Sequence, residues 1–142
     1  MPVDKFARES LPVPNFVLLW HTMPPDAERR SHFDLMLEEE GVLRTWAIEA
    51  EPSPQQTLAA LQLPDHRVAY LEYEGKISGG RGHVARKDAG TYRTLNKSAN
   101  KWELQVAGTR LRGRILLEQQ ADQRWTLSLS TAADFSEGSS SS

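Results

Sequence analysis

Alternation of residues with a period of two is the feature of this sequence that most restricts its fold. The segments HFDLMLE (32–38) and GVLRTWAIE (41–49) both alternate with a period of two. Successive side chains of a β-strand point to opposite faces of a sheet, whereas an amphipathic helix repeats its apolar residues every three or four positions. Each of these segments is therefore expected to be a strand.

Short segments of the same kind recur toward the end of the chain, separated by turns that contain Gly, Asn or Asp. They are RVAYLEYEG, HVARK, TYRTLN, KWELQVAG, TRLRGRILLEQQ and RWTLSLS. With NFVLLWH near the N-terminus, they give about eight short strands and at most one or two short helices. A sheet of this size must close or cover its edges, so we expect a mainly β (β-rich α+β) fold, either a small antiparallel β-barrel or a curled sheet. We assign to its core Phe33, Leu35, Leu37, Trp46, Trp102 and Trp125.

The segment SPQQTLAALQ (53–62) permits two interpretations. Ser53, Pro54 and Gln56 match the first residues of a capped helix. The continuation TLAALQL (57–63) suits a strand equally well. The local sequence leaves both structures open.

The length of 142 residues suits one domain with a sizeable core. We expect a β domain over 14–131, an N-terminal arm over 1–13 and a flexible polar tail over 132–142. No apolar run approaches the roughly 20 residues that span a membrane, and the first residues lack the apolar core of a signal peptide. The chain has no cysteine, which excludes disulfides and thiolate metal sites. These features predict a cytoplasmic protein with no membrane partner.

The net charge of -2 conceals an uneven distribution along the chain. Residues 76–114 contain ten Lys or Arg and only two acidic residues, whereas the remainder is strongly acidic. A basic segment in an acidic chain suits a polyanionic partner that meets one face of the protein. A solvated β surface with chance clustering of charge is the alternative.

Two histidines and an aspartate form the first candidate site. His32 and Asp34 are two positions apart in an alternating segment, so both project from one face, roughly 6–7 Å apart. The loop TMPPDAERRS (22–31) returns the chain from His21, and a hairpin there would place His21 beside them. Two imidazoles and one carboxylate can bind Mn²⁺, Fe²⁺ or Zn²⁺ and leave positions open, as in non-haem iron oxygenases. Ordinary polar residues on a solvated strand would give the same pattern.

Two later segments add candidate groups. His66 stands at a turn into the expected strand RVAYLEYEG and could act as a general acid or base or contact a phosphate, with Tyr70 on the same side as a hydrogen-bond donor. The loop SGGRGHV (78–84) offers exposed amides and Arg81 for an anion. The simpler alternatives are a half-buried sheet tyrosine and an ordinary glycine turn.

Taken in order, these segments resemble the 3′-phosphoesterase module of bacterial DNA ligase D, the end-joining ligase, over roughly residues 14–130. The resemblance rests on H…HFDLMLE, GVLRTWAI, DHRVAYLEYEG, GRGHV, DAGTY and LRGRILLEQQ…RWTLSL. It implies a β-barrel-like fold and a Mn²⁺-dependent activity, with Zn²⁺ or another divalent metal as alternatives. That activity removes a terminal ribonucleoside and then a 3′-phosphate from DNA or RNA–DNA 3′ ends. The implied partners are those ends, together with end-joining ligase or polymerase components.

The resemblance also implies roles for individual residues. His21, His32 and Asp34 match the metal ligands of the family. His66 matches its active-site histidine, and Tyr70 matches the tyrosine four residues later.

The chain departs from the family at three positions that carry phosphate-binding cations in the relatives. Met36 stands in place of an arginine, Ala50 in place of a lysine, and a third basic residue falls near Leu58. In one interpretation, other arginines restore the charge: Arg81 as a catalytic residue, with Arg67 and Arg30 or its neighbour Arg29 as phosphate-binding residues. In the other, the chain is a catalytically weak or inactive accessory module that binds metal and nucleic-acid ends, because losing one transition-state cation costs about 10²–10³ in rate.

Overall fold

The computed structural model describes residues 13–131. The predicted tail over 132–142 and all but the last residue of the predicted arm over 1–13 lie outside the described residues. Nine strands account for most of the described chain: β1 Asn15–Thr22, β2 His32–Glu39, β3 Val42–Ile48, β4 Thr57–Arg67, β5 Gly75–Lys76, β6 His83–Ser98, β7 Lys101–Gly108, β8 Arg112–Ala121 and β9 Arg124–Ser130.

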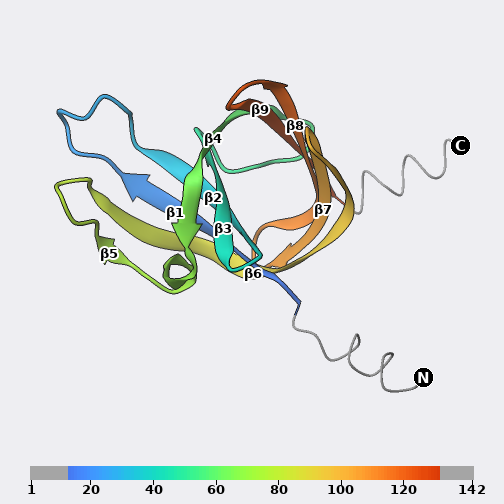
Figure 1. The fold of residues 1–142 in the computed structure, drawn as a ribbon, viewed down its shortest axis with the longest axis horizontal. Helices are drawn as coiled ribbons and strands as arrows, with labels where there is room; N and C mark the ends of the chain where they lie inside the picture. Colours follow the sequence, from blue (N-terminus) through green and yellow to red (C-terminus); the bar gives the residue numbers. More distant parts are fainter. Residues whose placement is uncertain (1–12, 132–142) are drawn as a thin grey trace, which may run out of the picture.

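The strands form one antiparallel sheet that curls into a ring (Figure 1). The order is β1-β2-β3-β4-β9-β8-β7-β6-β5, and an additional pairing of β1 with β6 closes it. The short strand β5 pairs only with the start of β6. The expectation of a mainly β, barrel-like fold is therefore confirmed, with nine strands instead of about eight.

The segment with two interpretations is a strand. β4 pairs with β3 on one side and with β9 on the other, so its alternating residues are fixed by two neighbours. Ser53 and Gln56 do contact each other, with Ser53 Oγ donating to Gln56 Oε1 at 2.6 Å, but in the loop before the strand. Tertiary pairing here decides between two locally acceptable structures.

The prediction that RVAYLEYEG forms a strand is wrong. β4 continues through Arg67, and the chain then turns into the 3-10 helix η1, Val68–Leu71. Tyr70 and Leu71 pack together against the outer surface of the sheet, which a two-faced strand could not achieve. No helix among residues 13–131 is long and apolar enough to cross a membrane.

The two expected strands HVARK and TYRTLN are instead parts of the single strand β6. Its first half pairs with β1 and its second half with β7. Gly90 lies where the two halves meet, and a Cβ there would stand 2.1 Å from the carbonyl oxygen of Ala107. The glycine therefore permits a close backbone approach within one continuous strand and does not end it.

The interior of the ring holds the main core. Trp46 lies between Trp102 and Trp125 in edge-to-face contact, with ring centroids 6.0 and 5.5 Å apart. All three tryptophans are buried, as are Leu35 and Leu37, while Phe33 is half-buried against the same cluster. The predicted core residues are thus confirmed.

A second apolar cluster lies on the outside of the ring. Its buried members are Val17, Leu19, Met36, Leu43 and Val84. Residues of the segment between β4 and β6, including Tyr70, Leu71 and Ile77, pack over them. The outer face of β1, β2 and β3 is therefore buried near its middle, and the candidate site lies at one end of this covered face.

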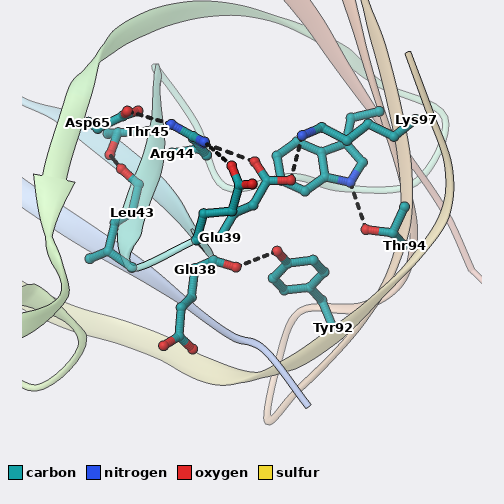
Figure 2. A network of polar contacts seen from close by, with 11 residues as sticks. Glu38, Glu39, Leu43, Arg44, Thr45, Asp65, Tyr92, Thr94 and Lys97 are labelled. Carbon is teal, nitrogen blue, oxygen red and sulfur yellow. Dashed lines mark hydrogen bonds and ion pairs between the residues drawn. The ribbon is translucent and has the colours of Figure 1, made fainter. Parts of the chain in front are cut away.

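A polar network ties the β2–β3 hairpin to its neighbours (Figure 2). Arg44 forms ion pairs with Glu39, Glu40 and Asp65, at 2.9, 3.0 and 2.6 Å. Lys97 of β6 pairs with the second oxygen of Glu39. Burial raises the pKa of Glu39, but its contacts with Lys97 and Arg44 outweigh this and hold the pKa below its usual range. The network fixes Asp65, the neighbour of His66, to the body of the sheet.

Candidate metal centre

The antiparallel pairing of β1 with β2 assembles the predicted cluster. His21 lies opposite His32 across the two strands, and Asp34 follows two positions later on the same face. His21 Nδ1 is 3.4 Å from Asp34 Oδ2, and His32 Nε2 is 3.1 Å from Asp34 Oδ1. One ligand atom from each of the three side chains lies within 4.8 Å of the others. The expectation that these groups converge is confirmed.

Each histidine uses its second nitrogen to contact the main chain. His21 Nε2 is 2.7 Å from the carbonyl oxygen of Arg81, and His32 Nδ1 is 2.8 Å from that of Arg30. A carbonyl oxygen only accepts, so each of these nitrogens carries a hydrogen. In the neutral rings, His21 Nδ1 and His32 Nε2 then direct lone pairs at Asp34. Backbone carbonyls orient metal-binding imidazoles in this way.

Two atoms of the cluster are buried without a hydrogen-bond partner: His32 Nε2 and Asp34 Oδ1. They face each other, and Asp34 is only 2% exposed. Two buried acceptors in this arrangement are unfavourable unless a proton or a cation lies between them. A His₂Asp donor set with unsatisfied, convergent lone pairs fits a divalent metal ion.

The electrostatics of the cluster favour a cation. Burial raises the pKa of Asp34, but its contacts with His21 and His32 outweigh this and lower the pKa, so the carboxylate is ionised at neutral pH. When His21 is protonated, it can donate a hydrogen bond from Nδ1 to Asp34, and this raises the pKa of His21 against the lowering effects of burial and of Arg29. A metal ion would have to displace a proton held there.

His66 reaches the same face because β4 contains a bulge. Leu63 pairs with Thr45 but His66 pairs with Leu43, so one extra residue is inserted around Pro64. Proline cannot donate to the ladder and is tolerated at such bulges. The insertion reverses the alternation and turns His66 toward the outer face. His66 therefore lies on β4, not at the start of a strand as predicted.

The imidazole of His66 is oriented by contacts to one of its two nitrogens, Nδ1. Its Nδ1 is 3.0 Å from both the Pro64 carbonyl oxygen and Thr45 Oγ1, and Thr45 Oγ1 donates to the Leu43 carbonyl oxygen. Nδ1 therefore carries the hydrogen, and Nε2 is left for a ligand. The Tyr70 ring lies edge-on to His66 with centroids 5.5 Å apart.

One cleft of about 490 Å³ unites most of the predicted site. Its lining includes His21, His32, Asp34, His66, Tyr70, Arg67 and Arg81. Arg30 is not among the lining residues, although its carbonyl holds His32 and its neighbour Arg29 does line the cleft. The loops that carry Arg29 and Arg81 project from the same side of the ring (Figure 1).

The three positions at which the resemblance implied cations hold apolar residues here, and of these only Met36 lines the cleft. Met36 is 1% exposed within the outer cluster, Leu58 belongs to the inner core, and Ala50 is half-buried against that core. Positive charge reaches the cleft from other places, through Arg29, Arg67 and Arg81.

Most of the basic segment 76–114 lies elsewhere in the sheet. Lys97, Arg110 and Arg114 form ion pairs with Glu39, Glu51 and Glu103. Of the basic residues in that segment, only Arg81 lines the cleft. The uneven charge along the chain is therefore a weak guide to this site.

Thr45 is a contributor that the sequence alone did not suggest. It is fully buried, it lies on β3 opposite Leu63, and it contacts the histidine that the bulge presents. The Pro64 that precedes Asp65 and His66 is the one local signal of that bulge in the sequence, because proline disrupts strand pairing.

Known proteins match most of this chain. The family described as DNA Ligase D 3'-phosphoesterase domain matches residues 25–120. The Multifunctional non-homologous end joining protein LigD of Mycobacterium bovis is 35% identical over 68% of this chain and 14% of its own length. The protein of the same name from Pseudomonas aeruginosa is 34% identical over 60% of this chain and 11% of its own length.

This chain thus spans a small part of each of these relatives. The family match includes His32, Asp34, His66 and Arg81 and begins after His21, which strand pairing brings to the cluster. The chain belongs to the DNA ligase D 3′-phosphoesterase domain family.

Proposed function

We propose that this protein is a metal-dependent phosphoesterase that processes the 3′ ends of DNA or RNA–DNA strands during DNA repair. The observation that carries the proposal is the pair of unsatisfied buried atoms, His32 Nε2 and Asp34 Oδ1, in a cleft that three arginines also line. A metal-binding set beside several cations suits a phosphate ester. The family and the end-joining relatives point the same way.

His21, His32 and Asp34 would hold the ion, with Mn²⁺ the expected metal and Zn²⁺ or another divalent ion the alternative. Such an ion supplies Lewis-acid polarisation of a phosphate oxygen and a water of lowered pKa. The carbonyls of Arg81 and Arg30 keep both imidazoles oriented for this task.

The other cleft residues serve the phosphate and the leaving group. Hydrolysis breaks a P–O ester bond and adds water, and the departing oxygen needs a proton. His66 in its imidazolium form donates that proton from Nε2, while the hydrogen on its Nδ1 stays on the ring and is donated toward the Pro64 carbonyl oxygen and Thr45 Oγ1. Arg67 and Arg81 neutralise charge on the phosphoryl oxygens, and Tyr70 donates a hydrogen bond.

A gel assay that measures trimming of a primer tests this activity. Primers that end in a single ribonucleotide or in a 3′-phosphate are incubated with the purified protein and Mn²⁺. We expect trimming to a 3′-hydroxyl that EDTA abolishes and that His32→Ala reduces at least a hundredfold.

His83→Ala serves as the matched control, because His83 is an exposed histidine on β6 that does not line the cleft. Its activity should equal that of the wild type. Trimming that persists in EDTA or in His32→Ala would refute the proposed activity.

A second candidate is a catalytically weak module that binds nucleic-acid ends without turnover. The apolar residues Met36, Leu58 and Ala50, at positions where the resemblance implied cations, favour it. It predicts salt-sensitive binding that charge reversal at Arg81 and Arg86 weakens, equal affinity with and without metal, and no trimming. Trimming by the wild type in Mn²⁺ excludes it.

A further inference from the structure

The outer face of the sheet continues past the candidate metal centre. Strand register places Asp34 opposite Ala47, Ala47 opposite Leu61, and Leu61 opposite Arg124. This row crosses β2, β3, β4 and β9. Neighbouring strands lie about 4.8 Å apart, so the row extends roughly 14 Å from the carboxylate.

A second pocket of about 370 Å³ lies along this row. Its apolar surface includes Ala47, Ala59 and Leu61, and Leu61 is 38% exposed. Arg29 and His32 line both this pocket and the metal cleft. A ligand that extends beyond the cleft on this side would therefore enter the second pocket directly.

The charged residues of the pocket are mostly positive. Arg29, Arg30 and Arg124 line it, with Glu49 as the acidic member. Within residues 13–131 the structure gives none of these three arginines an ion pair, unlike Arg44, which binds three carboxylates. Three such arginines beside an apolar surface complement a polyanion that carries flat apolar groups.

We propose that this second pocket binds the nucleotides that precede the 3′ end, with a base on Ala59 and Leu61 and backbone phosphates on Arg30 and Arg124. The proposal rests on the proposed function, because it takes the cleft as the place of the terminal phosphate. The roughly 14 Å row matches a few nucleotides at about 3.4 Å per stacked base. A positively charged groove that follows the backbone is a usual means of binding single strands without sequence preference.

The test measures binding separately from turnover. Fluorescence anisotropy reports the Kd of a labelled 12-nucleotide single strand with a 3′-phosphate, in EDTA and at fixed salt. We expect Arg124→Glu and Ala59→Trp each to raise the Kd about tenfold, the first by charge and the second by filling the pocket.

Arg93→Glu is the matched control for charge, because it makes the same change at an exposed position of β6 that pairs with β7, outside both pockets. We expect it to raise the Kd less than threefold. Circular dichroism and thermal melting of each variant verify that the sheet is retained.

The trimming assay separates the two proposals. If the pocket variants bind as tightly as Arg93→Glu, or if the wild type binds no strand, the pocket does not hold nucleic acid, and trimming of the short 3′ end by the wild type can still stand. If the pocket variants lose binding but the wild type never trims, the second pocket does bind nucleic acid and the proposed hydrolysis fails.

Discussion

Asp34 and Asp88 are both buried aspartates, and they are satisfied in opposite ways. Asp88 accepts hydrogen bonds from the backbone amides of Ala89, Thr109, Arg110 and Leu111. Asp34 meets two imidazoles and keeps one oxygen without a donor. The first arrangement is complete within the protein and shapes a turn, whereas the second would be completed by the cation that we propose. The contrast separates a structural carboxylate from a functional one.

Replacing Asp88 by Asn should destabilise the fold in a pH-dependent way. Burial raises the pKa of Asp88, but the four amides outweigh this and hold it below 3.8. A lowered folded-state pKa contributes stability above the unfolded pKa, and this stability is lost as the pH falls through the folded pKa. We expect the variant to lose roughly 1.5–3 kcal/mol of unfolding free energy at pH 7 and the difference to shrink below about pH 4.

Urea unfolding at several pH values measures this difference. Asp26→Asn, an exposed loop residue, is the control and should change the free energy by less than about 0.5 kcal/mol. A constant difference between pH 7 and pH 3 would show that the charge of Asp88 contributes nothing.

Among the elements, the bulge in β4 and the loop after β5 do most to build the site. The bulge around Pro64 turns His66 toward the cleft. The loop delivers the Arg81 carbonyl to His21, and Arg81 itself donates back to Ser78. Both are irregularities at the ends of regular strands, where side chains can be re-aimed without disturbing the core.

Gly82 fixes that loop against β1. A Cβ at this position would lie 1.9 Å from the carbonyl oxygen of Thr22, and the residue has φ +87. Gly82→Ala should therefore push the loop away from His21, weaken Mn²⁺ binding at least tenfold and lower Tm by several degrees. Isothermal titration with Mn²⁺ and thermal melting measure both effects.

Gly80→Ala is the matched control for Gly82→Ala. Gly80 also has a positive φ, +66, but nothing lies within 4 Å of its Cβ position. It should lose stability from backbone strain, on the order of 1 kcal/mol, with unchanged metal affinity. Equal metal affinity in the two variants would refute the role assigned to this loop.

At the scale of the whole molecule, the ring holds one core inside and a second cluster outside, and only the first was evident from the sequence. Alternation in HFDLMLE indicated one apolar face, yet Met36 on its other face is as deeply buried as Leu35. The covering residues come from the segment after β4, whose 3-10 helix has no clear pattern. Local periodicity reports one strand at a time and not what later folds over it.

The candidate site likewise has parts that the sequence predicted and parts that it did not. His32 and Asp34 could be paired from their spacing alone, because strand geometry fixes residues two apart. The approach of His66 depended on a one-residue bulge, and the exchange of Arg30 for Arg29 in the cleft depended on the path of an irregular loop. Thr45 was hidden because its role needs two strands in register. Groups within one strand were predictable, and groups joined by irregular segments were not.

Metal binding should stabilise the whole fold more at high pH than at low pH. The raised pKa of His21 contributes stability to the metal-free protein below about 6.5 that is lost as the pH rises through the folded pKa. A metal ion needs the deprotonated ring, so its effect runs in the opposite direction. At 100 times Kd it adds about 2.7 kcal/mol, or roughly 8 °C in Tm for a domain of this size.

Differential scanning fluorimetry with and without Mn²⁺ at pH 7.5 and pH 5.5 measures this effect. We expect the metal-induced increase in Tm at pH 7.5 and little or none at pH 5.5. An increase of the same size at both pH values would contradict competition between the ion and protons on the imidazoles.

The most direct test of the central claim is the Mn²⁺ stoichiometry of the purified protein by equilibrium dialysis at pH 7.5, compared between the wild type and Asp34→Asn. The account predicts one tightly bound ion per chain in the wild type and a loss of at least tenfold in affinity in Asp34→Asn, with the fold retained by circular dichroism. No saturable binding by the wild type, or the same affinity in both proteins, would contradict it.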